Sequence, residues 1–584
     1  MPAKWPIICV VVDGRGKLLS GASPFTVEVG SDTNVSALKK EIQSQNPRTL
    51  AAYDQMFMKL WKPTRDIGVV VANEKLKEVI DGLSIEANSN DVERLMEFEL
   101  VSEYWNAAPN QRLLQVILQL PQVNLPQKHQ REEDDTTTLV KRLKRVTDVA
   151  PSSLARPATF RNVVGEDKLI TVNRPYEPST IPIALYERAF GIFRDRCKQP
   201  PSNKAMNCLV HLTQVGCEWY PVEALRREAI AKVFSECLGL QFHAEKIGDT
   251  EYVTDGHLAF KIIPAAIRKC KNEDGSAMFQ AALYYVSFFM RALPDFGNRN
   301  TCFPSILVVD SGSKLSFYAA IWDGQRVKVE PLCRGIDLTA NWNELHARYE
   351  VAATLDALME AVHVIQAHDA LLESTIAPVE RSNLGAIPRY PYLTSYRNEN
   401  GQEVGLHYTA QLETDKLLFT ATSDQPDLQE CIVKFTQHEY SADAHNLLAM
   451  HQMAPKLQKI IEVPGGWKVV IMDRSKYHVL HHYPLSKELQ EKVKNKVKRI
   501  VRTLHQNGFV HGDIRAANLL IDPASLNSHD VQVHLIDFDW GGRAGEVRYP
   551  IGLNSETVMR PKEVQGGKLI LEAHDIEMIS SLFA

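Results

Sequence analysis

Apolar positions near the start of the chain alternate between the spacing of a strand and that of a helix. Residues 7–12 form a compact β-branched run, and residues 25–29 alternate apolar and polar side chains with a period of two. Together with the Gly-rich segment between them, these runs predict a β-hairpin. Residues 35–42 place apolar side chains at helical spacing, and residues 57–61 form another strand. This order predicts a small α+β domain.

The middle of the chain continues with alternating helical and strand patterns. An amphipathic helix over residues 221–238 begins the series. The expected elements that follow are a strand pair at 248–256 and 265–271, an apolar helix at 278–293, and strands at 305–310, 314–323 and 326–332. The series predicts an α/β domain.

The last part of the chain places a long amphipathic helix among apolar strands. The helix runs over residues 487–507, and Gly508 provides its stop signal. A strand at 429–435 holds one lysine, Lys434, and a buried strand that starts at residue 533 ends in Asp537. A single charged residue on an apolar strand is either a solvated residue at the strand edge or end, or part of a functional site.

Length and composition bound the number and type of domains. A chain of 584 residues is too long for one core, so we expect three or four domains. With 44% hydrophobic and 23% charged residues, it is not a mostly disordered chain. The formal net charge of -5 provides no overall basic field for nucleic acid. The expected domains are 1–121, 165–370 and 385–584, with a linker at 122–164.

Cysteine usage and apolar runs indicate the compartment. The nine cysteines form no C-x-x-C pair, so neither a zinc site nor a disulfide framework is indicated, and we expect reduced thiols. No apolar run reaches the ~20 residues of a membrane span. The first residues lack the apolar stretch of a signal peptide. If the protein is exported, we expect a non-standard route.

The first domain resembles the N-terminal header of Crinkler effectors. The resemblance rests on the opening apolar strand, the strand FTVEV, the helix VSALKKEI and the segment MKLWK. LLQVILQLP at residues 113–121 fills the place where a header ends in an apolar strand closed by proline. The resemblance implies a ubiquitin-like roll that serves delivery or interaction. It also implies a secreted effector that acts on host proteins inside a host or competitor cell, often in the nucleus.

A basic cluster lies in the expected linker. It consists of Lys141, Arg142, Lys144 and Arg145. It is either the solvated face of a helix or a patch for nuclear targeting or nucleic-acid binding, and the sequence leaves both open.

The middle domain resembles the restriction-endonuclease-like nuclease fold, in which two carboxylates hold Mg²⁺ and a lysine orients the attacking water. The resemblance carries these roles over in part, to Glu228, Asp255, Lys271 and Gln280. The second carboxylate should be residue 269, which is Lys269, and its positive charge repels a cation. We therefore expect a degenerate site on a scaffold that can still bind DNA, and the alternatives are an active DNA-cleaving nuclease and an unrelated α/β domain.

The C-terminal domain resembles a two-lobed protein kinase. Asn518 follows Asp513 by five positions, and Asp537 ends a buried strand further on. Phosphoryl transfer needs a carboxylate at the acceptor hydroxyl and oxygen ligands for Mg²⁺. The resemblance implies that Asp513 is the base, that Asn518 and Asp537 are metal ligands, and that Lys434 pairs the ATP phosphates. The implied cofactors are ATP and Mg²⁺.

Supporting positions and departures follow from the same resemblance. We expect His511 to hold the catalytic loop, Asp575 to anchor the loop backbone, and His445 to stand where the lysine's glutamate partner normally lies. Gly512 replaces the usual arginine, Asp539 replaces the usual glycine, and no G-x-G-x-x-G loop precedes Lys434. These traits resemble small atypical and lipopolysaccharide-kinase-like members with a short C-terminal lobe.

The sequence thus predicts a multidomain α+β protein and leaves three functions open. The first is a Crinkler-type effector or toxin that transfers phosphate from ATP to a protein hydroxyl. The second is an effector that binds or cleaves DNA through its middle domain. The third is a non-catalytic pseudokinase that acts as an interaction protein.

Overall fold

The structure is a computed structural model of the 584-residue chain. It describes residues 4–119 apart from 13–15, 19–23, 31, 46–58, 69–72, 86–88, 96–98 and 106, and residues 143–583 apart from 145, 148, 161–168, 173–179, 248–252, 273–275, 297–300, 375–389, 399, 414–415, 426–427, 483–484, 529, 555–557 and 559. The chain divides into two compact units, Met1–Glu132 and Glu133–Ala584. Within the described ranges, no helix has the length and apolar character needed to cross a bilayer.

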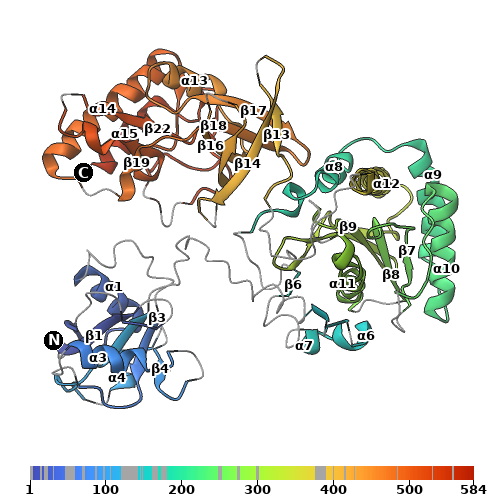
Figure 1. The fold of residues 1–584 in the computed structure, drawn as a ribbon, viewed down its shortest axis with the longest axis horizontal. Coiled ribbons are helices and arrows are strands. Elements are labelled where there is room, and N and C mark those ends of the chain that lie inside the picture. Colours follow the sequence, from blue (N-terminus) through green and yellow to red (C-terminus); the bar gives the residue numbers. More distant parts are fainter. Residues whose placement is uncertain are drawn as a thin grey trace. The chain divides into compact units, whose positions relative to one another are not determined.

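The N-terminal unit is built on a five-stranded mixed sheet (Figure 1). Its elements are β1 (Lys4–Val12), β2 (Phe25–Gly30), α1 (Val35–Gln45), β3 (Lys59–Pro63), α3 (Asn73–Asp81), β4 (Val92–Arg94), α4 (Val101–Tyr104) and β5 (Val116–Gln119). The strand order is β2-β1-β5-β3-β4, with β1 antiparallel to β2 and parallel to β5. The predicted hairpin and the helix that follows it are both present.

Strand β1 is buried on both faces, which explains its continuous apolar run. Ile7 and Val11 pack in one cluster with side chains of α1. Ile8 and Val10 pack in a second cluster with side chains of α3. Because successive strand residues point to opposite faces, a strand covered on both sides needs apolar residues at every position.

The middle part of the second unit is built on a mixed sheet in the order β6-β11-β10-β9-β8-β7, with β12 paired to β10. Its elements are α6 (Pro151–Leu154), α7 (Pro157–Phe160), β6 (Ile170–Thr171), α8 (Arg188–Arg196), α9 (Asn203–Gly216), α10 (Glu223–Val233), β7 (Gly256–His257), β8 (Ala266–Lys271), α11 (Ala277–Phe296), β9 (Ser305–Ser311), β10 (Lys314–Trp322), β11 (Val327–Pro331), β12 (Ile336–Asp337) and α12 (Leu345–Ser374). Strands β8 and β9 are parallel, and α11 is the crossover between them. The β9–β10–β11 meander is antiparallel.

Helices cover both faces of this sheet (Figure 1). Helix α11 lies on one face, where Phe289 and Leu307 belong to one buried cluster. Helices α8, α9 and α12 lie on the other face, where Phe193 and Leu355 pack in a cluster with Phe317. The sheet is therefore a central layer between two helical layers.

Residues 143–160, which the sequence assigned to the linker, contribute to the same core. Leu143, Leu154 and Phe160 are buried in the α11 cluster. Phe160 stacks on Phe279 with 4.4 Å between ring centroids. This segment therefore belongs structurally to the middle part.

The C-terminal part has two lobes. Its elements are β13 (Ser395–Arg397), β14 (Glu403–Gln411), β15 (Leu418–Ser423), β16 (Glu430–Thr436), α13 (Ala442–Met450), β17 (Leu457–Val463), β18 (Trp467–Asp473), β19 (His478–Val479), α14 (Lys487–Gln506), β20 (Phe509–Val510), β21 (Leu519–Ile521), β22 (Val533–Leu535), β23 (Gly542–Arg543) and α15 (Glu572–Leu582). The first lobe holds the sheet β13-β14-β15-β16-β18-β17. The second lobe holds α14, α15 and the small sheets β19-β21-β22 and β20-β23.

Helix α14 leads directly to the loop that carries the candidate site. The side chain of Ser486 accepts a backbone N–H at the helix N-terminus. Val493, Val497 and Ile500 form its buried stripe. Gly508 follows the last turn with a φ of 75°, as the stop signal predicted.

Candidate active site

The loop after β20 is shaped by Gly512. This residue has a φ of 81°, a conformation that side chains with a Cβ rarely adopt. A Cβ at this position would also lie 2.9 Å from Cδ1 of Ile570. The arginine that usually stands here in kinases would therefore not fit this loop.

A buried carboxylate holds the loop in place. Asp575 on α15 is fully buried and accepts the backbone N–H groups of His511 at 2.9 Å and Gly512 at 2.7 Å. Its Oδ2 also lies 3.0 Å from Nε2 of His505 on α14. The Nδ1 atom of His511 in turn accepts the backbone N–H of Asp513. Asp575 thus fixes the backbone of the loop at His511 and Gly512, and the His511 ring fixes it at Asp513.

Asp513 lies at the centre of a polar cluster. Nδ2 of Asn518 donates to its Oδ2 at 2.8 Å and to its backbone oxygen at 2.9 Å. Nε of Arg515 lies 3.0 Å from the same Oδ2. Nη1 of Arg560 donates to the other carboxylate oxygen, Oδ1, at 3.0 Å. The carboxylate is therefore held at both oxygens, in the geometry expected of a positioned base.

Lys434 on β16 reaches two carboxylates that follow β22. Its Nζ lies 2.5 Å from Oδ1 of Asp537 and 2.8 Å from Oδ1 of Asp539. The hydroxyl of Thr436 donates to the other oxygen of Asp539 at 3.1 Å. Asp537 has a φ of 73°, which is uncommon for a residue other than glycine and is typical of functional turns.

The charges of this cluster shift one another's pKa values. Burial lowers the pKa of Lys434, but Asp537 and Asp539 outweigh burial and raise it above its ordinary value. Burial raises the pKa of Asp537, but the positive charge of Lys434 outweighs it, and the net direction is downward. Burial dominates at Asp539 and raises the pKa of that carboxyl. Lys434 therefore stays charged and Asp537 stays ionised at neutral pH.

His445 stands on α13 but does not contact the lysine. Its Nδ1 lies 2.8 Å from the hydroxyl of Tyr440, and its Nε2 lies 2.8 Å from the backbone oxygen of Pro455. The ring stacks on Phe538 with 4.6 Å between centroids. Burial lowers the pKa of this imidazole to about 4, so it is neutral at pH 7. His445 is a packing residue, and Asp539 takes the role of second partner to Lys434.

The donor set fits a hard divalent cation. The two bonds from Nδ2 of Asn518 to Asp513 fix its amide and leave the amide oxygen as an acceptor. The lowered pKa of Asp537 keeps that carboxylate ionised, and the backbone N–H of the preceding Ile536 donates to the backbone oxygen of Asn518 at 3.0 Å. Such oxygens are the ligands that Mg²⁺ takes. Among the described residues, no group of three or more His, Cys, Asp or Glu side chains forms a ready-made metal cage.

In the middle part, residues that the resemblance assigned to a nuclease site form ion pairs. Lys269 pairs with Asp255, whose carboxylate also accepts the backbone N–H of Cys270 at 3.0 Å. Lys271 pairs with Glu223 at 2.9 Å. Glu228 is instead exposed, although the sequence placed it at this site. The buried face of α10 contains residue 226, and a residue two positions further on points to the opposite side.

Gln280 is buried on α11, where its backbone N–H continues the helix.

The sequence analysis missed a buried triad of charged residues in the same part. Nε of Arg226 lies 3.2 Å from Oδ1 of Asp310, and Nε of Arg268 lies 2.7 Å from its Oδ2. These residues lie on separate elements, so no local pattern could indicate the contact. Both arginines also donate to backbone oxygens, of Gly216 and Arg227, so these contacts form a structural network.

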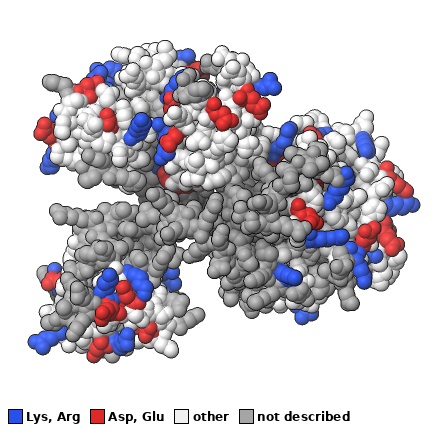
Figure 2. Space-filling model, viewed as in Figure 1, with Lys and Arg blue, Asp and Glu red and all other residues white. Residues whose placement is uncertain are grey.

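Of the basic cluster, Lys144 is exposed on a short helical segment. Lys141, Arg142 and Arg145 lie outside the described residues. On the face drawn in Figure 2, the basic and acidic side chains of the described residues are interspersed. That face therefore offers no broad basic surface among them.

Two family models match separate parts of the chain. Residues 7–119 match the Crinkler effector protein N-terminal domain. Residues 473–548, which include Asp513, Asn518 and Asp537, match the lipopolysaccharide kinase (Kdo/WaaP) family. No curated protein matches the chain. The chain thus carries a Crinkler effector N-terminal domain and a kinase-like C-terminal domain, which confirms both resemblances.

Solved kinase structures are similar at low identity. The Cydia pomonella granulovirus kinase PK-1 shares 16% identity at a TM-score of 0.26, over 31% of this chain and 66% of that chain. Vaccinia related kinase 3 shares 15% identity at a TM-score of 0.26, over 34% and 68%. The BubR1 kinase domain shares 16% identity at a TM-score of 0.25, over 32% and 63%. The match spans 66% of the first of these kinase chains.

Proposed function

We propose that this chain is a Crinkler-type secreted effector whose C-terminal domain transfers the γ-phosphate of ATP to a hydroxyl of a host protein. The observation that carries the proposal is the contact between Asn518 and Asp513, together with the pairing of Lys434 to Asp537. These contacts join the three chemical roles that phosphoryl transfer requires: a base, oxygen ligands for a cation, and a phosphate-pairing lysine.

Each side chain has one role in the proposed reaction. The acceptor oxygen attacks the γ-phosphorus, the bond to ADP breaks, and the carboxylate of Asp513 receives the hydroxyl proton. Lys434 pairs the ATP phosphates. Asn518 and Asp537 would hold Mg²⁺, which supplies neutralisation of the phosphate charge when it is bound.

The test is ATP binding and autophosphorylation by the purified full-length chain. We expect labelled phosphate on the wild type, and transfer at least about a hundredfold slower in Asp513→Ala with ATP affinity retained. Asp537→Ala should lose both phosphate transfer and ATP binding. Asp443→Ala, which removes an exposed carboxylate of α13, is the matched control and should behave as wild type. Absence of nucleotide binding by the wild type would overturn the proposal and favour the pseudokinase.

The N-terminal domain is proposed as a ubiquitin-like roll for delivery or interaction. The central parallel pair β1 and β5, flanked by antiparallel strands, supports this topology. We also propose that the protein enters the nucleus of a host cell through its basic cluster. Alanine at Lys141, Arg142, Lys144 and Arg145 should abolish nuclear accumulation of a tagged chain, and an unchanged distribution counts against this targeting.

The middle part is proposed as a degenerate restriction-endonuclease-like scaffold. The ion pair between Lys269 and Asp255 supports this view, because the lysine occupies the coordination space that a metal ion would need. A DNA partner for this part remains the alternative, and gel-shift binding of duplex DNA by the full-length chain tests it.

A further inference from the structure

Arg560 lies beside the proposed base, although it is far from it in sequence. Its Nη1 donates to Oδ1 of Asp513 at 3.0 Å, and the two residues are 47 positions apart. Only 7% of its side chain is exposed. Arg560 lies in the segment between β23 and α15. The roles proposed above for ATP binding, metal binding and base catalysis do not include it.

The guanidinium is held in this position from two further sides. It stacks over the ring of Trp540 with 4.8 Å from Cζ to the centroid, and its Nε donates to the backbone oxygen of Asn554 at 3.4 Å. A guanidinium has five N–H donors, and the contacts to described residues use two of them. Arg560 is therefore a positioned cation, and three of its five donors have no acceptor among the described residues.

The contact constrains where the acceptor hydroxyl can lie. A general base must be within ~3 Å of the proton donor, so the acceptor oxygen comes within ~3 Å of the Asp513 carboxylate. Each carboxylate oxygen has two lone pairs, so Oδ1 can accept both the arginine and the hydroxyl. An acceptor oxygen bound at Oδ1 therefore lies within about 6 Å of Nη1 of Arg560. Groups next to the acceptor residue come within reach of the guanidinium.

Arg515 adds a second positive charge next to the Asp513 carboxylate. Arg515 lies 3.0 Å from the other oxygen, Oδ2, so two guanidinium groups flank one carboxylate. A single carboxylate does not neutralise two cations, and a buried positive charge favours an anionic neighbour. The charge of Arg515 also acts on Asp537, whose pKa it lowers, so Arg560 is the cation left at the oxygen of Asp513 where the acceptor binds.

We infer that Arg560 is a specificity-determining residue that selects an acceptor peptide with a carboxylate or phosphate group adjacent to the acceptor hydroxyl. This inference rests on the proposed phosphotransfer to protein. The anionic group pairs with Arg560 in a bidentate manner and places the hydroxyl against Asp513.

The test uses serine peptides that differ only in the residues flanking the acceptor: alanine, aspartate, phosphoserine or lysine. With the full-length wild type, we expect kcat/KM for the aspartate and phosphoserine peptides to exceed that for alanine by about ten- to hundredfold. The aspartate and phosphoserine arms separate a carboxylate from a phosphate as the recognised group. In Arg560→Gln this ratio should fall to about one, with an unchanged KM for ATP. Arg560→Lys should retain part of it, and Arg560→Glu should prefer the lysine peptide.

The matched control is Arg502→Gln, which removes an exposed arginine of α14 and should leave the ratio as in wild type. A peptide with alanine in place of the acceptor serine and a neighbouring phosphoserine should inhibit the wild type and not Arg560→Gln.

Five outcomes would overturn the inference. A wild type that ignores flanking charge overturns it while the proposed function stands. If kcat/KM of Arg560→Gln falls equally for all peptides, Arg560 has a structural role. If kcat/KM rises equally for all peptides, the contact of Arg560 with Asp513 is autoinhibitory. Autophosphorylation without transfer to any of these peptides overturns selection of the acceptor by flanking charge, while phosphotransfer to a protein hydroxyl stands. A wild type that neither binds ATP nor autophosphorylates overturns the proposed function and the inference with it.

Discussion

Lys434 pairs with Asp539, a residue of the turn after β22, and not with a side chain of helix α13. In protein kinases the equivalent lysine pairs with a helix glutamate, and helix movement controls that pair. Here Asp539 follows Asp537 by two positions, so one turn supplies both carboxylates. The pairing of Lys434 therefore needs no side chain of α13, although His445 of that helix stacks on Phe538 between the two carboxylates.

Asp539 should be a positioning residue for ATP. Asp539→Asn removes one of two negative charges from Lys434, so we expect kcat/KM for ATP to fall about tenfold, chiefly through KM, since a charge-assisted bond contributes about 1.5 kcal/mol or more. Steady-state kinetics of ATP consumption checks this. The control is Glu439→Gln, because Glu439 is exposed and pairs with Lys468 outside the site. Equal kinetics for Asp539→Asn and wild type would refute the role.

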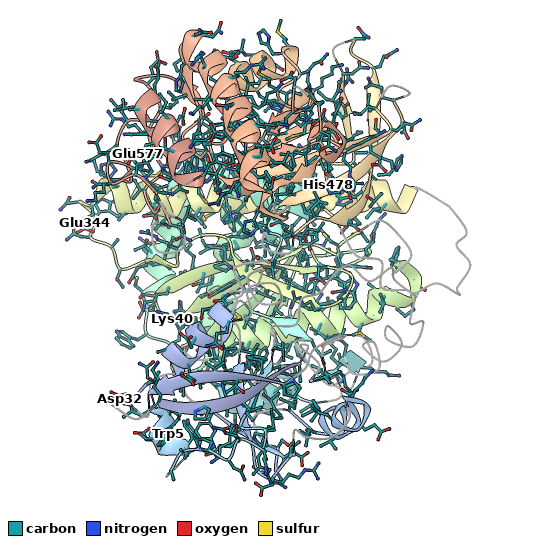
Figure 3. The ribbon with its side chains drawn as sticks, turned by 90° about the vertical axis from the view of Figure 1, so that its left-hand side faces the viewer. Trp5, Asp32, Lys40, Glu344, His478 and Glu577 are labelled. Carbon is teal, nitrogen blue, oxygen red and sulfur yellow. The ribbon has the colours of Figure 1, made fainter. Side chains whose placement is uncertain are left out.

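The anchor of the catalytic loop should be a stability determinant. Asp575→Asn keeps the size of the side chain but loses one acceptor for the backbone N–H groups of His511 and Gly512. We expect the free energy of unfolding of the C-terminal part to fall by about 2 kcal/mol. Hydrogen exchange of α14 amides measures it. Glu577→Gln, on the exposed side of α15 (Figure 3), should change nothing.

The C-terminal part should lose stability in mild acid. Burial lowers the pKa of His445 to about 4, and burial does the same for His534. An unfolded histidine has a pKa of about 6.5. The unfolded chain therefore binds more protons between these values, and stability that is full above about pH 6.5 is lost as the pH falls toward 4.

The expected loss between pH 7 and pH 5 is about 2 kcal/mol for each histidine. Urea unfolding followed by hydrogen exchange of α13 amides measures it at both pH values. His445→Gln should be less stable at pH 7 but should lose about 2 kcal/mol less on acidification. An identical pH dependence in the variant and the wild type would contradict burial of a neutral imidazole.

The middle part should not cleave DNA. Because Lys269 pairs with Asp255, we expect wild type and Asp255→Ala to leave supercoiled plasmid intact with Mg²⁺ or Mn²⁺. Metal-dependent nicking by the wild type that disappears in Asp255→Ala would show an active nuclease.

Loss of the ion pair between Lys269 and Asp255 should lower the free energy of unfolding of the middle part. Asp255→Asn leaves a buried lysine unpaired and should cost about 3 kcal/mol of unfolding free energy, whereas Asp255→Asn combined with Lys269→Met should recover most of it. Denaturant unfolding of the single and double variants measures this difference. A double variant as unstable as the single would show that the pair is not the reason for the loss.

Short-range patterns were sufficient for the elements that carry the site. The apolar run of β1, the stripe of α14 with Gly508 at its end, and the spacing of Asp513 and Asn518 all lie within segments of a few turns or strands. Periodicity and end signals depend on neighbours in sequence, so the chain alone determines them. The resemblance to a Crinkler header and to a kinase followed from such segments.

The partners of the charged residues were decided only by the tertiary structure. Asp539 meets Lys434, Arg560 meets Asp513, and Glu223 meets Lys271. Each contact joins elements far apart in the chain, and its existence depends on how strands and helices pack and on which face of a helix is buried. Sequence spacing carries no information on that packing, because charge pairing acts through space and the chain brings its partners together only when the core has formed.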